Sequence, residues 1–188
     1  CGTAGAKLVS ASLGAAAVDA AVKLARDPQA GVRVAAGRAA ARIASADPAK
    51  LLPAAAQVLS GLMGPDQATE VARQALLATR RMAEAITEPL SAGDAAAANA
   101  GLLEQQWPVL VPPMCALAMS TSGPVKATCE RSLARVLGLG VSLDGAHRYL
   151  AGSPGATVRT ALTEPFLKRL QKLAAGGDED ELFAVEEY

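Results

Sequence analysis

The stretch Asp27-Pro28-Gln29-Ala30-Gly31-Val32-Arg33 is a turn followed by the start of a helix, and a similar phrase recurs later in the chain. Pro65-Asp66 is followed by Val71-Ala72-Arg73, so the second turn acid comes 39 residues after the first. A turn followed by Val-Lys or Val-Arg occurs twice more, at Pro124-Val125-Lys126 and at Thr157-Val158-Arg159. Self-similarity at a period near 40 residues is typical of arrays of helical hairpins. The repeat therefore predicts an all-α chain built from stacked hairpins.

Apolar and alanine residues recur at helical spacing between these turns, and Pro and Gly mark the ends of the segments. We expect four hairpins, over residues 6–46, 48–87, 102–139 and 142–174. Their helices are expected over residues 6–25, 30–45, 48–63, 67–86, 102–119, 125–139, 142–150 and 157–174, with a kink at Pro112-Pro113. Residues 91–100 are small and polar, and we interpret them as an insertion that forms a loop or a marginal helix.

The composition of the 188 residues agrees with one alanine-rich helical unit: 51% are hydrophobic and only 3% are aromatic. It excludes a disordered or collagen-like chain and disfavours a β-sandwich. The most apolar run, residues 107–119, is too short to cross a bilayer, and no signal-peptide pattern opens the chain. Three cysteines without a pairing motif indicate a reducing compartment, the cytosol or the nucleus, and of these we expect the cytoplasm. Because the chain begins at Cys1, we expect a piece of a longer polypeptide or a processed product.

The charges are balanced in number but not in position. There are 18 basic and 18 acidic side chains, and six of the acids follow the last base, Lys172. The chain up to that lysine therefore carries a net charge of +6, and the remainder carries −6. We expect a folded unit over residues 1–175 and a flexible, disordered acidic tail over residues 176–188, joined at Gly176-Gly177.

The turn phrase resembles the HEAT repeat, in which an Asp in the turn is followed by Val and Arg at the start of the second helix. Asp27, Val32 and Arg33 match that spacing, whereas the second unit places its arginine one residue late and the last two units lack the Asp. The resemblance implies a curved HEAT/armadillo-type α-solenoid, which is a scaffold far more often than an enzyme. We therefore expect a non-enzymatic chain with no cofactor and no small-molecule substrate.

Basic residues occupy similar positions in the second helix of each hairpin. We expect Arg33, Arg73 and Lys126, near the helix starts, to hydrogen-bond the acids and carbonyls of the turns. The candidate partner-binding residues lie deeper along the same helices: Arg42, Arg81 and Arg135. Stacked hairpins would align them along one surface, where they could contact an acidic protein or phosphate. No aromatic residues interleave with them, which disfavours a platform that stacks single-stranded bases.

Other candidate motifs point to structure rather than chemistry. His147 has no carboxylate or cysteine partners at metal-ligand spacing, and Cys115 and Cys129 fit core positions, so we expect no metal site. The start of the chain, residues 2–7, lacks the glycine and the preceding strand of a phosphate-binding loop. Trp107 is expected to seal the core at the start of the third hairpin, with a role as a partner anchor as the alternative.

A longer resemblance covers roughly residues 105–180. The stretches Trp107-Pro-Val-Leu-Val-Pro-Pro-Met114, Pro124-Val-Lys-Ala-Thr-Cys-Glu-Arg-Ser-Leu-Ala-Arg-Val-Leu-Gly-Leu139 and Leu167-Lys-Arg-Leu-Gln-Lys-Leu173, followed by acids, are similar to the C-terminal end of the giant HEAT-repeat translational activators of the general amino-acid control pathway. That family implies a scaffold that binds ribosomes under stress and helps activate the kinase of initiation factor two. The partner that the resemblance implies here is a protein or the ribosome, with contact to rRNA phosphate.

The ending Glu186-Glu187-Tyr188 supplies the alternative, because it resembles the acidic-aromatic end of α-tubulin tails. These three residues are therefore also candidate partner-binding residues. The alternative function is a cytoskeletal HEAT-repeat module that binds tubulin or proteins that recognise tubulin tails. A third hypothesis for the function is a transport-type adaptor.

Overall fold

The computed structural model describes residues 14, 16–87 and 94–139, and every regular element within them is an α-helix. A helical segment over residues 16–24 comes first. It is followed by α2 (Ala30–Ala46), α3 (Pro48–Leu62), α4 (Thr69–Thr87), α5 (Asp94–Gln105), α6 (Trp107–Ser120) and α7 (Gly123–Gly138). The all-α prediction is confirmed for this part of the chain. The expected hairpin over residues 142–174 and the expected acidic tail lie outside the described residues.

Four of the helices, α2, α3, α4 and α7, begin and end within two residues of the ranges expected from the sequence. Local chemistry explains the agreement. Pro48 occupies the first turn of α3, where a missing N–H costs no helical hydrogen bond. Gly123 opens α7 with a φ of 59°, a left-handed conformation that glycine adopts without a steric penalty.

In the segment interpreted as an insertion, the helical alternative holds from Asp94 onward, and the helix expected over residues 102–119 begins later than predicted. Residues from Asp94 onward form a regular helix, α5, and a separate helix, α6, begins at Trp107 after Gln106. Alanine favours a helix, and the amide of Asn99 donates a hydrogen bond of 3.0 Å to the carbonyl of Ile86 in the last turn of α4. The insertion is therefore a helix whose polar side chain is bonded to the preceding element.

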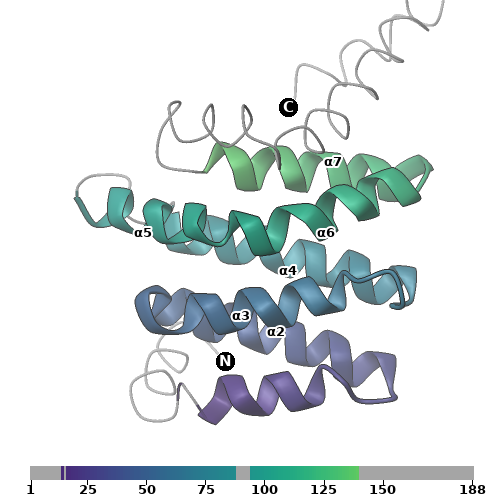
Figure 1. Cartoon of the computed structure of the whole chain (residues 1–188), viewed down its shortest axis with the longest axis horizontal. Helices are drawn as coiled ribbons and strands as arrows, with labels where there is room; N and C mark the ends of the chain where they lie inside the picture. Colours follow the sequence, from purple (N-terminus) through teal and green to yellow (C-terminus); the bar gives the residue numbers. More distant parts are fainter. Residues whose placement is uncertain (1–13, 15, 88–93, 140–188) are drawn as a thin grey trace, which may run out of the picture.

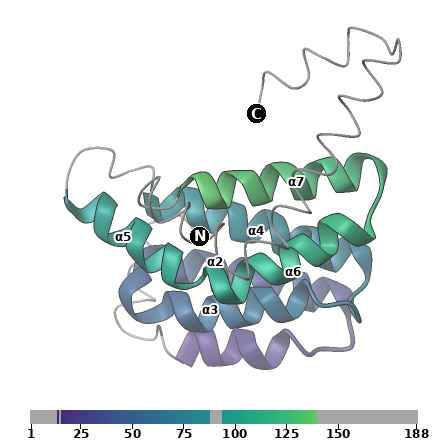
Figure 2. The ribbon, with the colours of Figure 1, turned by 45° about the horizontal axis from the view of Figure 1, so that its top comes forward.

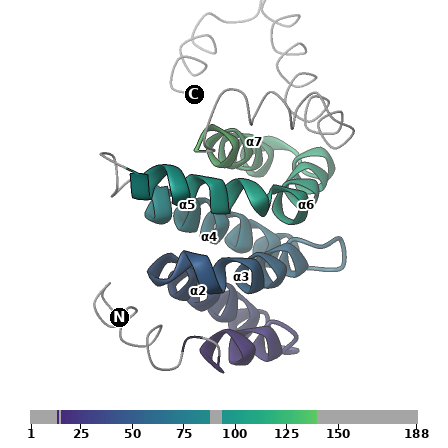
Figure 3. The ribbon, with the colours of Figure 1, turned by 60° about the vertical axis from the view of Figure 1, so that its left-hand side comes forward.

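The helices form two rows, which Figures 1 and 3 show from two sides. One row consists of α2, α4 and α7, with α4 in contact with both of the others. The second row contains α3 and α6, which contact each other, and α5 packs against α3, α4 and α6. α3 is antiparallel to α2 and α4, and α6 is antiparallel to α7 and runs like α3, so α2, α4 and α7 all run in the same direction (Figures 1 and 2). No helix in the described ranges combines the length and the apolar character needed to cross a bilayer.

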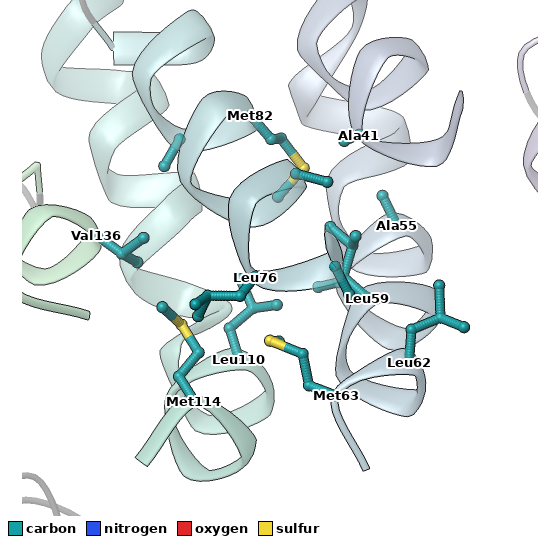
Figure 4. Close-up of a cluster of buried hydrophobic side chains, with 14 of the residues drawn as sticks. Ala41, Ala55, Leu59, Leu62, Met63, Leu76, Met82, Leu110, Met114 and Val136 are labelled. Atoms are coloured by element: carbon teal, nitrogen blue, oxygen red, sulfur yellow. The ribbon is translucent and has the colours of Figure 1, made fainter. Parts of the chain in front are cut away.

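The core lies between the two rows. Leu59 of α3, Met63 directly after that helix, Leu76 of α4 and Leu110 of α6 gather there in the close-up of Figure 4. Trp107 is fully buried, which confirms that its ring belongs to the core. A continuous apolar core therefore connects the hairpins and fixes which helix faces remain outside.

Small residues allow α2 to approach α3 closely. α2 contributes Ala40, Ala41 and Ala44 to the core. A Cβ atom built on Gly37 would come within 2.8 Å of Cδ1 of Leu62. The alanine-rich composition thus serves close helix packing in this part of the molecule.

Candidate interaction surface

The charges of the described helices are divided between the two rows. α2, α4 and α7 carry nine basic and three acidic side chains, a net charge of +6. α3, α5 and α6 carry only Lys50, Asp94 and Glu104, a net charge of −1. Since buried positions cannot hold unpaired charge cheaply, the basic residues of the first row lie at its surface.

Besides Arg33, which is bound to its own turn, seven arginines of this row are exposed or half-buried. We call these seven the arginine face: Arg38 and Arg42 of α2, Arg73, Arg80 and Arg81 of α4, and Arg131 and Arg135 of α7. The two arginines of α2 and the two of α7 are four residues apart, and Arg73 and Arg80 of α4 are seven apart, so each pair lies on one side of its helix, with Arg81 next to Arg80. The three helices are neighbours in the row, so their arginines form one surface.

Hydrogen bonds join α2 to α4 across this surface. A guanidinium N–H of Arg38 donates to the side-chain oxygen of Gln74 at 2.6 Å. The amide of Gln74 in turn donates to Glu70 at 2.8 Å, and Arg73 donates two bonds of 2.7 and 2.8 Å to the same carboxylate. These bonds, that of Arg73 first, lower the pKa of Glu70 to about 2.

A single carboxylate joins α4 to α7. Oε1 of Glu84 accepts hydrogen bonds from Nε of Arg80 at 2.9 Å and from Nε of Arg135 at 3.3 Å. Arg135 lies 51 residues further along the chain than Glu84. The contact is part of an exposed network, so it fixes the two guanidinium groups more than it stabilises the fold.

Arg42 and Arg81 differ from these neighbours. Both are exposed, and neither forms a hydrogen bond or ion pair with another residue of the described part. α2 contains no acidic residue that could compensate Arg42 within its own helix. Uncompensated positive charge therefore remains on α2 and α4.

The turn-binding role expected for three basic residues holds for one of them. Nη1 of Arg33 donates to the carbonyls of Asp27 at 2.7 Å and of Pro28 at 2.9 Å, so the guanidinium closes its own turn. Arg73 instead binds Glu70 of its own helix, because the acid lies three residues earlier on the same side. Lys126 is half-buried, and no bond joins its ammonium to another described residue.

The structure places the predicted residues Arg42, Arg81 and Arg135 on the three helices of one row, and all three are exposed. Their binding role stays a prediction. The other predicted residues, Glu186, Glu187 and Tyr188, lie outside the described part, as does His147.

The sequence reasoning missed Arg38, Arg80, Arg131 and the shared acceptor Glu84. Arg38 and Arg131 each come four residues before a predicted arginine, so the helical repeat contained a signal for them. Glu84 had no such signal, because its partner Arg135 belongs to another hairpin.

The two described cysteines are core residues, as expected. Both are buried and unpaired. Burial raises the pKa of Cys115 to about 11 and also raises the pKa of Cys129. Among the described residues, no three His, Cys, Asp or Glu side chains gather in a way that could hold a metal ion.

Comparisons of the chain with protein-family models, with curated proteins and with solved structures found no match. The arginine face and the repeat pattern are therefore the observations from which a function can be argued.

Proposed function

We propose that this chain is a segment of a HEAT-type α-solenoid that acts as a non-enzymatic scaffold in the cytoplasm and binds ribosomes through the arginine face. The observation that carries the proposal is the division of charge, +6 on the row of α2, α4 and α7 against −1 on the row of α3, α5 and α6. A surface charged on one side attracts a polyanion and orients the protein on it.

The arrangement of the helices supports a scaffold role. Each hairpin buries its apolar face against its neighbours, and the helices of one row repeat at the spacing of packed helices, about 8–10 Å. Such a row offers a broad surface in place of a single cavity. A large partner with many charges spaced along its surface, such as a ribosome, matches that surface better than a small molecule does.

The resemblance over residues 105–180 supplies the cellular role within the proposal. It includes α6 and α7, so the helix that carries Arg131 and Arg135 is part of the stretch that is similar to the translational activators. In this role the chain holds the ribosome during stress while the parent protein helps activate the initiation-factor kinase.

The test is co-sedimentation of the full chain with purified ribosomes and, separately, with microtubules, over a series of salt concentrations. We expect ribosome pelleting that weakens with salt and is lost when Arg42, Arg81 and Arg135 are replaced by Glu. The matched control replaces Lys23, Arg26 and Lys50, which are exposed but lie outside the basic row, with the same change of charge. This control should pellet like the wild type.

Two outcomes contradict the proposal. If the control variant loses pelleting as completely as the arginine variant, net charge and not the arginine face is responsible. If the chain pellets with microtubules and not with ribosomes, the cytoskeletal alternative replaces the translational one.

A further inference from the structure

The positive charge of the arginine face is not evenly compensated. Arg73 is bound to Glu70, and Arg80 and Arg135 share Glu84. Arg38, in contrast, is held by the neutral amide of Gln74, and Arg42 and Arg81 are bonded to no described residue. The guanidinium groups that no carboxylate binds directly are thus Arg38, Arg42 and Arg81, which flank the line of contact between α2 and α4. Of these three, only Arg38 is close enough to Glu70 to lower the pKa of that carboxyl by its charge.

The hydrogen bond between Arg38 and Gln74 sets the register of the two parallel helices. Arg42 lies four residues beyond Arg38, about 6 Å along the axis, and Arg81 lies seven residues beyond Gln74, about 10 Å along the axis. Measured along the helix axes, Arg42 and Arg81 are therefore within one helical turn of each other. The axes of two packed helices such as α2 and α4 are about 8–10 Å apart. Arginine side chains are long enough for both guanidinium groups to reach one phosphate or two successive phosphates between the helices.

We propose that the α2–α4 seam, defined by Arg38, Arg42 and Arg81, binds the backbone phosphates of double-stranded RNA. The inference rests on the proposed function, since it names the part of the ribosome that the arginine face contacts. The proposed ligand is RNA. Binding to an acidic ribosomal protein instead is one of the outcomes that the test distinguishes.

Three properties of the seam fit a phosphate backbone. All its bases are arginines, whose planar fork can donate two parallel hydrogen bonds to phosphate. Arg38 and Arg42 stand four residues apart on a helix without an acid, a like-charge pair that disfavours the helix until an anion lies between them. The third property is the orientation of the Arg38 guanidinium, which Gln74 fixes without neutralising its charge.

The chemistry around the seam favours a duplex over a single strand. Trp107 is the only aromatic residue in the described part of the chain, and it is fully buried. The described surface therefore has no ring on which an unpaired base could stack. A duplex presents its phosphates outward, and proteins read it mainly through its shape and backbone.

The test measures binding of the full chain to a fluorescently labelled RNA duplex by anisotropy, over a series of salt concentrations. The variants are Arg42→Gln, Arg81→Gln and the double substitution, and the matched control is Lys50→Gln. Lys50 is exposed like the two arginines but lies on α3, in the other row, where its ammonium is 3.7 Å from the carboxylate of Asp47. The three side chains are exposed, so circular dichroism should show the same helix content for all variants.

We expect each arginine substitution to weaken RNA binding about fivefold to tenfold near 0.1 M salt, because each removes about one phosphate contact and its released counterion. The slope of log K against log salt should fall by about 1 for each arginine removed, and the Lys50 control should stay within twofold of the wild type. Arg42→Lys keeps the charge and loses the fork, so it should keep the slope and bind more weakly.

The inference is wrong if the arginine variants bind the duplex no more weakly than the Lys50 control. It is also wrong if the chain pellets ribosomes through Arg42 and Arg81 but does not bind the RNA duplex. In that case the seam contacts ribosomal protein, and the proposed function stands. If neither ribosomes nor duplex RNA bind, both proposals fail.

Discussion

The arginines of α2, α4 and α7 differ in the group that accepts hydrogen bonds from the guanidinium, and this group decides whether the arginine supports the fold or is open to a partner. Arg33 donates to two turn carbonyls and joins a helix to the turn before it. Arg73 binds a carboxylate on its own helix, while Arg42 has no acceptor in the described part. Residues of one type thus serve as a turn closure, a partner in an ion pair or an open binding group, depending on what lies within reach.

Glu70 provides a test of these contacts through pH. The hydrogen bonds of Arg73 and Gln74 lower its pKa from the ordinary value of 4.5 to about 2. Because the folded pKa is below the unfolded one, the contact stabilises the fold above about pH 4.5, and this contribution is lost as the pH falls toward 2. Glu70→Gln should therefore lose less stability than the wild type between these two pH values.

The measurement is the free energy of urea unfolding across that pH range. Glu104→Gln is the matched control, since the carboxylate of Glu104 has no bonding partner among the described residues. If the wild type and Glu70→Gln lose stability in parallel on acidification, the bonds between Glu70, Arg73 and Gln74 do not persist in solution.

Individual helices were largely predictable, and the exception has a physical reason. Pro28, Pro48 and Pro65 mark helix starts locally, so α2, α3 and α4 could be located from the chain alone. For α5 the sequence left both a loop and a marginal helix open, because Asp94–Gln105 has no strongly amphipathic pattern. The bond from Asn99 to Ile86 ties this helix to the end of α4, and that contact depends on how the chain returns across the intervening residues.

Two glycines on neighbouring helices should respond oppositely to alanine. Gly61 is exposed near the end of α3, and a Cβ atom there would meet nothing within 4 Å. Gly61→Ala should stabilise the fold by about 0.5–1 kcal/mol through helix propensity. Gly37→Ala gains the same propensity but places a Cβ atom 2.8 Å from Leu62, a side chain only 1% exposed.

Overpacking of this kind costs about 1–3 kcal/mol, so Gly37→Ala should leave the protein up to about 2 kcal/mol less stable. Urea unfolding of both variants measures the difference. Equal stabilisation by the two substitutions would mean that α2 and α3 pack less closely than the structure shows.

At the scale of the whole molecule, the sequence predicted that basic residues would align but not which of them would be compensated. Arg42, Arg81 and Arg135 were expected on one surface because the repeat places second helices side by side. The bond from Arg135 to Glu84 joins residues of different hairpins and depends on the rotation of α7 against α4. The spacing of residues along the chain does not predict a pair between distant helices. The structure was therefore needed to tell which arginines are bonded to a carboxylate and which are not.

The distribution of charge along the entire chain leads to a further expectation. The six acids of residues 178–187 bring the net charge from +6 to zero. Replacing them with the corresponding amides should strengthen binding to the RNA duplex at low salt, because their long-range repulsion of phosphate is removed. The difference should vanish at about 1 M salt, where the screening length is about 3 Å.

Anisotropy over the same salt series is the measurement. A smaller gain is expected when the amide replacements are combined with Arg42→Gln and Arg81→Gln. Unchanged affinity at the lowest salt concentration would show that the acidic residues do not influence the arginine face.

The common direction of α2, α4 and α7 gives the arginine face a polarity along its helices. Each helix carries about half a positive elementary charge at its N-terminus and half a negative charge at its C-terminus. Since the three helices begin at the same edge of the molecule, their dipoles add there, beside Arg33, Arg73 and Lys126. α3 and α6 of the other row run in the opposite direction, so their dipoles oppose these at long range. The gradient therefore acts only on a polyanion in contact with α2, α4 and α7, which it draws toward the edge where these helices begin.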